Sequence, residues 1–186
     1  MKRLASILIL VAMLTGCGVN NGELDRAMAL RAKLLASSGC SFDATITADY
    51  GETVYTFCVG IRGDEKGGVT FTVKEPETIA GITGTVSGEG GRITFDGQVL
   101  SFELMADGQL TPVSAPWLLV RSLRSGYVRS CGRDGEQIRL EVADSFREDA
   151  LNLDIWLGDS DLPVSAQIVY DDRRILSLEV TNFQFL

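Results

Sequence analysis

The sequence predicts a mainly β (α+β) domain in which a curved antiparallel sheet is covered by short helices. Apolar and polar residues alternate from Phe42 to the end of the chain, in about ten short runs of the kind that form strands. Gly, Asp and Asn residues separate many neighbouring runs, which is typical of tight turns between antiparallel strands. Two segments with helical periodicity, one before the strands and one among them, are suited to cover a sheet face.

The N-terminus has the features of a bacterial lipoprotein signal. Lys2 and Arg3 precede an apolar run over 4–14. This run is too short to span a membrane as a helix, which needs about 20 residues. The run leads into LTGC at 14–17, which resembles the lipobox L-[AST]-[GA]-C, whose cysteine receives a diacylglycerol and becomes the first residue after cleavage.

We therefore expect residues 1–16 to be a signal peptide and 17–22 a lipidated tether. Residues 23–186 then form one domain, held on the extracytoplasmic face of the cell membrane by the acyl chains on Cys17. The alternative is an ordinary signal peptide followed by an unmodified cysteine.

Composition excludes several classes of function. The formal net charge is −8, and removal of Lys2 and Arg3 with the signal makes it −10, which does not suit binding to nucleic acid. The chain contains no histidine, so nucleophile–histidine catalysis and the usual zinc sites are absent. Carboxylates are plentiful but cluster in turn-like segments, and we expect neither catalysis nor a cofactor or metal. Cys40, Cys58 and Cys131 match no metal motif, and their disulfide state stays open.

The first helix is predicted over 23–39, with Gly39 as its stop. Its apolar stripe is expected to comprise Leu24, Met28, Ala32 and Leu35.

A β-hairpin is predicted from Phe42 to Ile61. With Tyr50-Gly51 as a two-residue turn, Ala44 lies opposite Phe57 and the apolar residues of both strands share one face. The further strands are expected at 68–73, 81–88, 92–95, 98–105, 126–131, 136–144, 150–158, 163–170 and 174–185, with a turn at Asp96-Gly97.

A second helix is predicted after Ser114, which can cap it, with Pro116 in its first turn and Gly126 as its end. Its residues 117–120 are all apolar, so we expect it to be buried against the concave face of the sheet. A short helical turn is plausible in PETIAG at 76–81.

The order of these elements resembles the LolA/LolB-like family of lipoprotein carriers and related bacterial lipoproteins. The resemblance covers nearly the whole chain after the signal and is carried by Pro76 before a short turn, the FDG hairpin at 95–97, Leu162-Pro163 and the closing TNF at 181–183. It implies an incomplete β-barrel with helices over its mouth and an apolar interior that receives acyl chains. A lipid anchor departs from the soluble carriers of that family and suits an anchored lipid-binding protein.

Two functions follow as hypotheses. The first is a membrane-anchored lipoprotein that binds lipid or lipoprotein acyl chains in an apolar cavity. The alternative is a cell-envelope interaction or assembly lipoprotein with a filled core, which binds its partner through its outer surface near Cys58 and Trp156. The candidate cavity-lining residues for the first function are Phe42, Ile46, Phe57, Val59, Phe71, Trp117, Leu119 and Leu153.

Overall fold

The computed structural model describes residues 22–106, 109–143, 151–170 and 173–186. It is mainly β, as predicted, with thirteen strands and two α-helices, α2 (Gly22–Ala36) and α3 (Ala115–Ser125), in the described part. The strands of the N-terminal half are β1 (Gly39–Asp49), β2 (Val54–Asp64), β3 (Val69–Glu75), β4 (Thr83–Ser87), β5 (Gly90–Phe95), β6 (Gln98–Phe102), β7 (Met105–Ala106) and β8 (Gln109–Leu110). Those of the C-terminal half are β9 (Tyr127–Asp134), β10 (Gln137–Ala143), β11 (Asn152–Leu157), β12 (Pro163–Tyr170) and β13 (Arg173–Phe185). The described part also contains two short 3-10 turns, Glu77–Ile79 and Pro112–Ser114, and the first confirms the helical turn expected at 76–81. The predicted strand residues 144 and 150 lie outside the described part.

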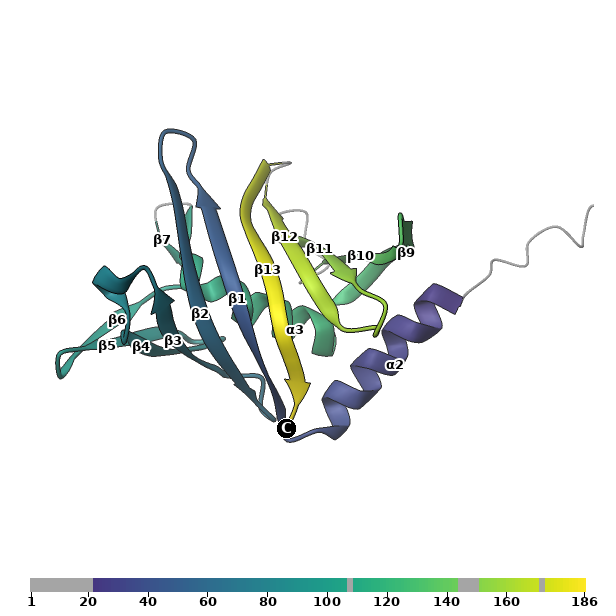
Figure 1. Cartoon of the computed structure of the whole chain (residues 1–186), viewed down its shortest axis with the longest axis horizontal. Coiled ribbons are helices and arrows are strands. Elements are labelled where there is room, and N and C mark those ends of the chain that lie inside the picture. Colours follow the sequence, from purple (N-terminus) through teal and green to yellow (C-terminus); the bar gives the residue numbers. More distant parts are fainter. Residues whose placement is uncertain (1–21, 107–108, 144–150, 171–172) are drawn as a thin grey trace, which may run out of the picture.

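Eleven strands form one antiparallel sheet in the order β6-β5-β4-β3-β2-β1-β13-β12-β11-β10-β9, while β7 and β8 pair separately. Each half of the sheet is a meander of sequence neighbours, and the two meanders join where β1 pairs with β13. The sheet is not closed, because β6 and β9 are edge strands at its two ends. Figure 1 shows this open sheet with α3 behind its central strands and α2 beside the β9 end.

The first hairpin is confirmed, but its predicted register is wrong by two residues. Ala44 lies opposite Val59, and Phe57 lies opposite Ile46, because the connection is a four-residue loop over 50–53 rather than a two-residue turn. A shift of two residues leaves every side chain on its predicted face, since side chains alternate with a period of two. The apolar residues of β1 therefore still face the core.

The predicted stripe of α2 is wrong in its C-terminal half: Met28 packs against the core, but Ala32 and Leu35 are exposed. Its buried residues are Ala27, Leu30 and Leu34, whereas Leu35 is 52% exposed. The helix carries two apolar stripes, and the one containing Ala27 faces α3 and β9, on which α2 packs. A small alanine there allows close approach of the neighbouring elements. The helix also ends earlier than expected, at Ala36, and Gly39 begins β1.

Helix α3 has the predicted limits and is buried, with contacts to β2, β11 and β13. The predicted cap is wrong: Ser114 lies at the N-cap position but makes no side-chain capping bond. A 3-10 turn at Pro112–Ser114 runs directly into α3, so Ser114 has helical backbone angles and its hydroxyl faces the interior instead. No helix in the described part is long and apolar enough to cross a membrane.

Candidate functional site at the mouth of the curved sheet

One end of the apolar sheet face is left without cover. Cross-strand pairing aligns Ile61, Phe71, Gly84, Ile93 and Leu100 from β2 to β6, and residues directly opposite each other point to the same face. Ile61 and Phe71 are buried beneath the helices, whereas Leu100 at the edge is 66% exposed.

Phe95, two residues after Ile93 on the same face of β5, is 56% exposed. We call Ile93, Phe95 and Leu100 the uncovered strip. It is a continuation of the core face beyond the part on which α3 packs, and it presents large apolar side chains to solvent.

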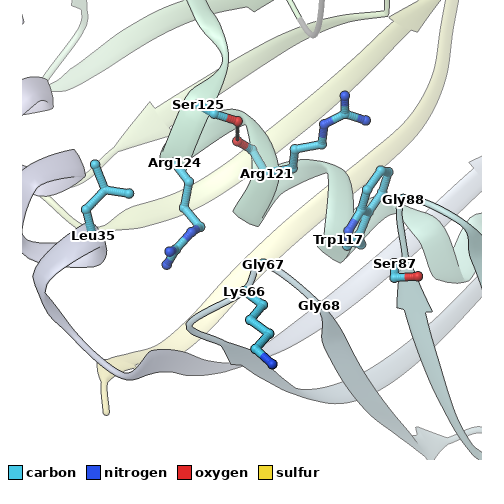
Figure 2. Close-up of a pocket in the computed structure, with 10 residues that line it drawn as sticks. All are labelled: Leu35, Lys66, Gly67, Gly68, Ser87, Gly88, Trp117, Arg121, Arg124 and Ser125. Atoms are coloured by element: carbon cyan, nitrogen blue, oxygen red, sulfur yellow. Dashed lines mark hydrogen bonds between the residues drawn. The ribbon is translucent and has the colours of Figure 1, made fainter.

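A hollow of about 430 Å³ opens between the β2–β3 turn, the β4–β5 turn, the C-terminal end of α2 and helix α3. Trp117 of α3 and Leu35 of α2 give it an apolar lining. Figure 2 shows Trp117 beside Gly88 of the β4–β5 turn and Arg124 directed toward the space between Leu35 and Lys66. A second hollow of about 420 Å³ adjoins it at Ser87 and is lined mainly by polar residues of β4, β5 and β6.

The charged side chains that line the first hollow are all cationic. They are Lys66 of the β2–β3 turn and Arg121 and Arg124 of α3, and no Asp or Glu of the described residues lines it. Arg121 lies over the ring of Trp117, with its guanidinium carbon 5.1 Å from the ring centroid. We call this site the basic hollow.

Two arginines fasten α2 and α3 to each other. Arg31 of α2 donates to the carbonyls of Leu123 (2.7 Å), Ser122 (3.0 Å) and Gly126 (2.8 Å) at the end of α3. Arg124 of α3 donates in return to the carbonyl of Leu34 at the end of α2 (3.1 Å) and to that of Glu65 in the β2–β3 turn (2.7 Å).

Each guanidinium thus supplies donors to carbonyls at the C-terminal end of the other helix, where the helix dipole favours a cation. Burial lowers the pKa of the Arg31 guanidinium from its usual value. The position of α3 over the sheet therefore depends on a polar clasp as well as on apolar packing.

The eight residues predicted to line a cavity lie together in the core cluster or against it. Phe57 is partly buried, and the other seven are buried. Only Trp117 among the eight also lines the basic hollow. In the described conformation α3 fills the space over the other candidates, which pack as core side chains do.

Cys17 lies outside the described residues. Cys40, Cys58 and Cys131 are free thiols, and burial raises the pKa of the Cys40 thiol to about 11. The described residues include no cluster of His, Cys, Asp and Glu that could hold a metal ion.

Trp156 lies on the opposite face from its core neighbours, where its indole nitrogen donates to Asp134 (2.8 Å) and Arg139 lies over its ring. Its polar atom is engaged within the sheet, so the residue anchors neighbouring strands on the outer face.

Sequence reasoning missed both the uncovered strip and the basic hollow. The sequence of β5 and β6 is that of an ordinary pair of strands. The exposure of the strip depends on where α3 ends over the sheet. One signal for the hollow was available: Arg121 and Arg124 are three residues apart, a spacing that places both on one side of a helix that is otherwise strongly apolar.

No protein-family model matches the chain, and no curated protein matches its sequence. Solved structures with a similar course of the chain include a LolA superfamily protein from Nitrosomonas europaea, at 8% identity and a TM-score of 0.46, covering 86% of this chain and 93% of that one. A domain named for outer membrane lipoprotein sorting, from Vibrio parahaemolyticus, gives 8% identity, a TM-score of 0.48 and coverage of 89% and 92%. The lipoprotein LppX of Mycobacterium tuberculosis has 9% sequence identity and a TM-score of 0.41, and the match covers 87% of this chain and 93% of that one.

The family that the sequence resembles is thus represented among these structures. All three TM-scores are below 0.5.

Proposed function

We propose that this chain is an extracytoplasmic, lipid-anchored bacterial protein that binds an acyl chain on the concave face of its sheet. The observation that carries the proposal is the uncovered strip, because Phe95 and Leu100 extend the core face into solvent. Large apolar side chains grouped on a concave surface lose unfavourable contact with water when an apolar ligand covers them. The LTGC sequence at 14–17, which resembles a lipobox, supports the anchor.

The eight predicted lining residues would contact the acyl chain if α3 moved away from the sheet. Two hydroxyls of the α3 region, Ser114 Oγ and Ser122 Oγ, are buried without a hydrogen-bond partner among the described residues. A buried polar group without a partner costs about 1–3 kcal/mol, so the docked position of α3 carries a penalty that withdrawal would relieve. An acyl chain that starts on the strip could then extend toward Phe71, the strip's buried neighbour in the same cross-strand row.

The proposal assigns a binding role and no reaction. The chain has no histidine, and four of its carboxylates, on Glu23, Asp43, Asp154 and Asp161, form ion pairs with arginine or lysine. None of these four carboxylates lines either of the two hollows described above.

The test uses a chain that begins at residue 18, produced without detergent. Native mass spectrometry is expected to show co-purified lipid, and a fluorescent fatty acid is expected to bind. Leu100→Ser should weaken probe binding roughly fivefold, because about half of one leucine's transfer free energy is lost from the contact.

Val99→Ser is the matched control. Val99 is 60% exposed on the same strand but points to the opposite face, because it pairs with Thr94 rather than Ile93. Equal effects of the two substitutions, or a chain that carries no lipid and binds no probe, would contradict acyl binding on the concave face.

A second candidate, an envelope assembly protein with a filled core, is favoured by the dense packing of the eight predicted residues and by the free edge of β6. An edge strand offers unpaired backbone groups to which a partner strand can add. Absence of lipid together with loss of a protein partner on substitution of Val99 would support it.

A further inference from the structure

We infer that the basic hollow binds the phosphate group of an anionic lipid whose acyl chain lies on the uncovered strip. The inference rests on the proposed function and adds the class of headgroup. It starts from the charge of the hollow: Lys66, Arg121 and Arg124 line it without a carboxylate among the described residues, in a chain with 25 acidic and 17 basic residues. A local reversal of charge inside a hollow favours an anionic ligand.

Acidic residues stand in the two turns beside the hollow, but none of those in the described part lines it. Asp64 accepts the backbone N–H groups of Lys66 (2.8 Å) and Gly68 (2.9 Å), which holds it within the β2–β3 turn. Glu65 contributes its backbone carbonyl to Arg124, and Glu89, which follows Gly88, lines the neighbouring polar hollow. None of the four ion pairs found among the described residues involves a cation of the basic hollow.

Arg124 is positioned in advance. Its two bonds are to the carbonyls of Leu34 and Glu65, which orient the guanidinium without neutralising its charge. Lys66 and Arg121 are exposed on either side and have long side chains, so both can turn toward a bound anion. Arginine pairs with phosphate through two parallel hydrogen bonds, and lysine adds a point charge.

The apolar lining indicates an amphiphile rather than a free ion. Trp117 is buried beneath Arg121, and Leu35 exposes 52% of its surface at the rim. Ser87, which borders the hollow, pairs with Gly90, and the strip begins three residues later along β5, about 10 Å away. One lipid can therefore place its phosphate among the three cations and its acyl chain on the strip.

The experiment uses the full, lipidated chain in a nonionic detergent. Two fluorescent short-chain lipids with identical acyl groups are compared, one a phosphatidic acid and the other a phosphatidylcholine, and inorganic phosphate is titrated separately. The test variant is Lys66→Gln/Arg121→Gln, which leaves the structural bonds of Arg124 in place. The matched control is Arg62→Gln/Arg129→Gln, which removes the same charge from exposed residues that do not line the hollow.

We expect the phosphatidic acid to bind more tightly than the phosphatidylcholine, and the test variant to weaken it at least about tenfold while the phosphatidylcholine changes less than about twofold. An equal loss in the control variant would overturn the inference, because general electrostatics would then explain the preference. Inorganic phosphate that binds as tightly as the lipid would make the hollow a free-phosphate site and overturn the lipid assignment. Equal binding of both lipids, unchanged in the test variant, would refute the headgroup site and leave acyl binding intact, whereas failure of both lipids to bind would refute the proposed function itself.

Discussion

The clasp between α2 and α3 offers a quantitative test through Arg31→Met, which keeps the length of the side chain and removes its donors. In the wild type the guanidinium donates to three carbonyls at the end of α3. The Ser122 carbonyl keeps a second donor, the Gly126 N–H at 2.9 Å. The carbonyls of Leu123 and Gly126 lose the charged donor that Arg31 supplies.

Each acceptor left without its partner costs about 1–3 kcal/mol. Two acceptors therefore give about 2–6 kcal/mol, and release of Arg31 from a partly buried position, where its pKa is lowered, offsets part of this sum. We expect Arg31→Met to lower the free energy of unfolding by about 2–4 kcal/mol.

Urea unfolding followed by tryptophan fluorescence measures the change, because Trp117 is buried within α3. The matched control is Arg26→Met on the same helix, which removes an exposed ion pair to Asp161 and should have a smaller effect. If Arg31→Met destabilises the protein no more than Arg26→Met does, the clasp does not hold α3. If α3 is the displaceable cover, Arg31→Met should also increase uptake of the fluorescent fatty acid.

Three further predictions concern single positions. Gly84→Ala should destabilise the domain by about 1–3 kcal/mol in urea unfolding, because a Cβ there would lie 2.3 Å from the Arg92 carbonyl oxygen. The control Gly132→Ala, which has open space around it, should be nearly neutral, and equal effects of the two substitutions would contradict this packing. Burial raises the pKa of the Cys40 thiol from about 9 to about 11, so the folded state favours the neutral thiol. The free energy of unfolding should therefore fall by about 2–3 kcal/mol as the pH rises from 9 to 11, and a Cys40→Ala variant with the same pH dependence would exclude the thiol as its source. Cys17→Ala should leave the chain unprocessed or release it from the membrane fraction, and normal cleavage with retained anchoring would refute the lipobox assignment.

The strands were predictable because apolar and polar residues alternate with a period of two, and this pattern identifies the core face even where the register is predicted wrongly. The first hairpin shows this: its register differs by two residues from the prediction, yet Ala44 and Val59 lie on the predicted core face. The loop length was not predictable, since Gly51 is compatible with more than one turn. The packing face of α2 was predicted wrongly because Leu24 and Leu34 belong to different apolar stripes, and only the position of α3 decides between them.

The candidate site depends on relations between distant segments. Leu35, Lys66 and Arg124 meet in one hollow although they belong to a helix, a turn and a second helix. No periodicity in the sequence links such positions. The exposure of Leu100 likewise follows from the 11-residue length of α3, which at 1.5 Å per residue extends only about 16 Å across the sheet.

The pairing of β1 with β13 has a consequence for the order in which the sheet folds. Asn182 donates to Asp43 across this pair although the two residues are 139 positions apart, whereas strands within each meander pair with near neighbours. Local hairpins can form as soon as their strands are synthesised, but the two meanders can join only after β13 is available. Until then one edge of β1 remains open, with its core face lacking the neighbouring strand, and during this interval the chain most needs protection from aggregation.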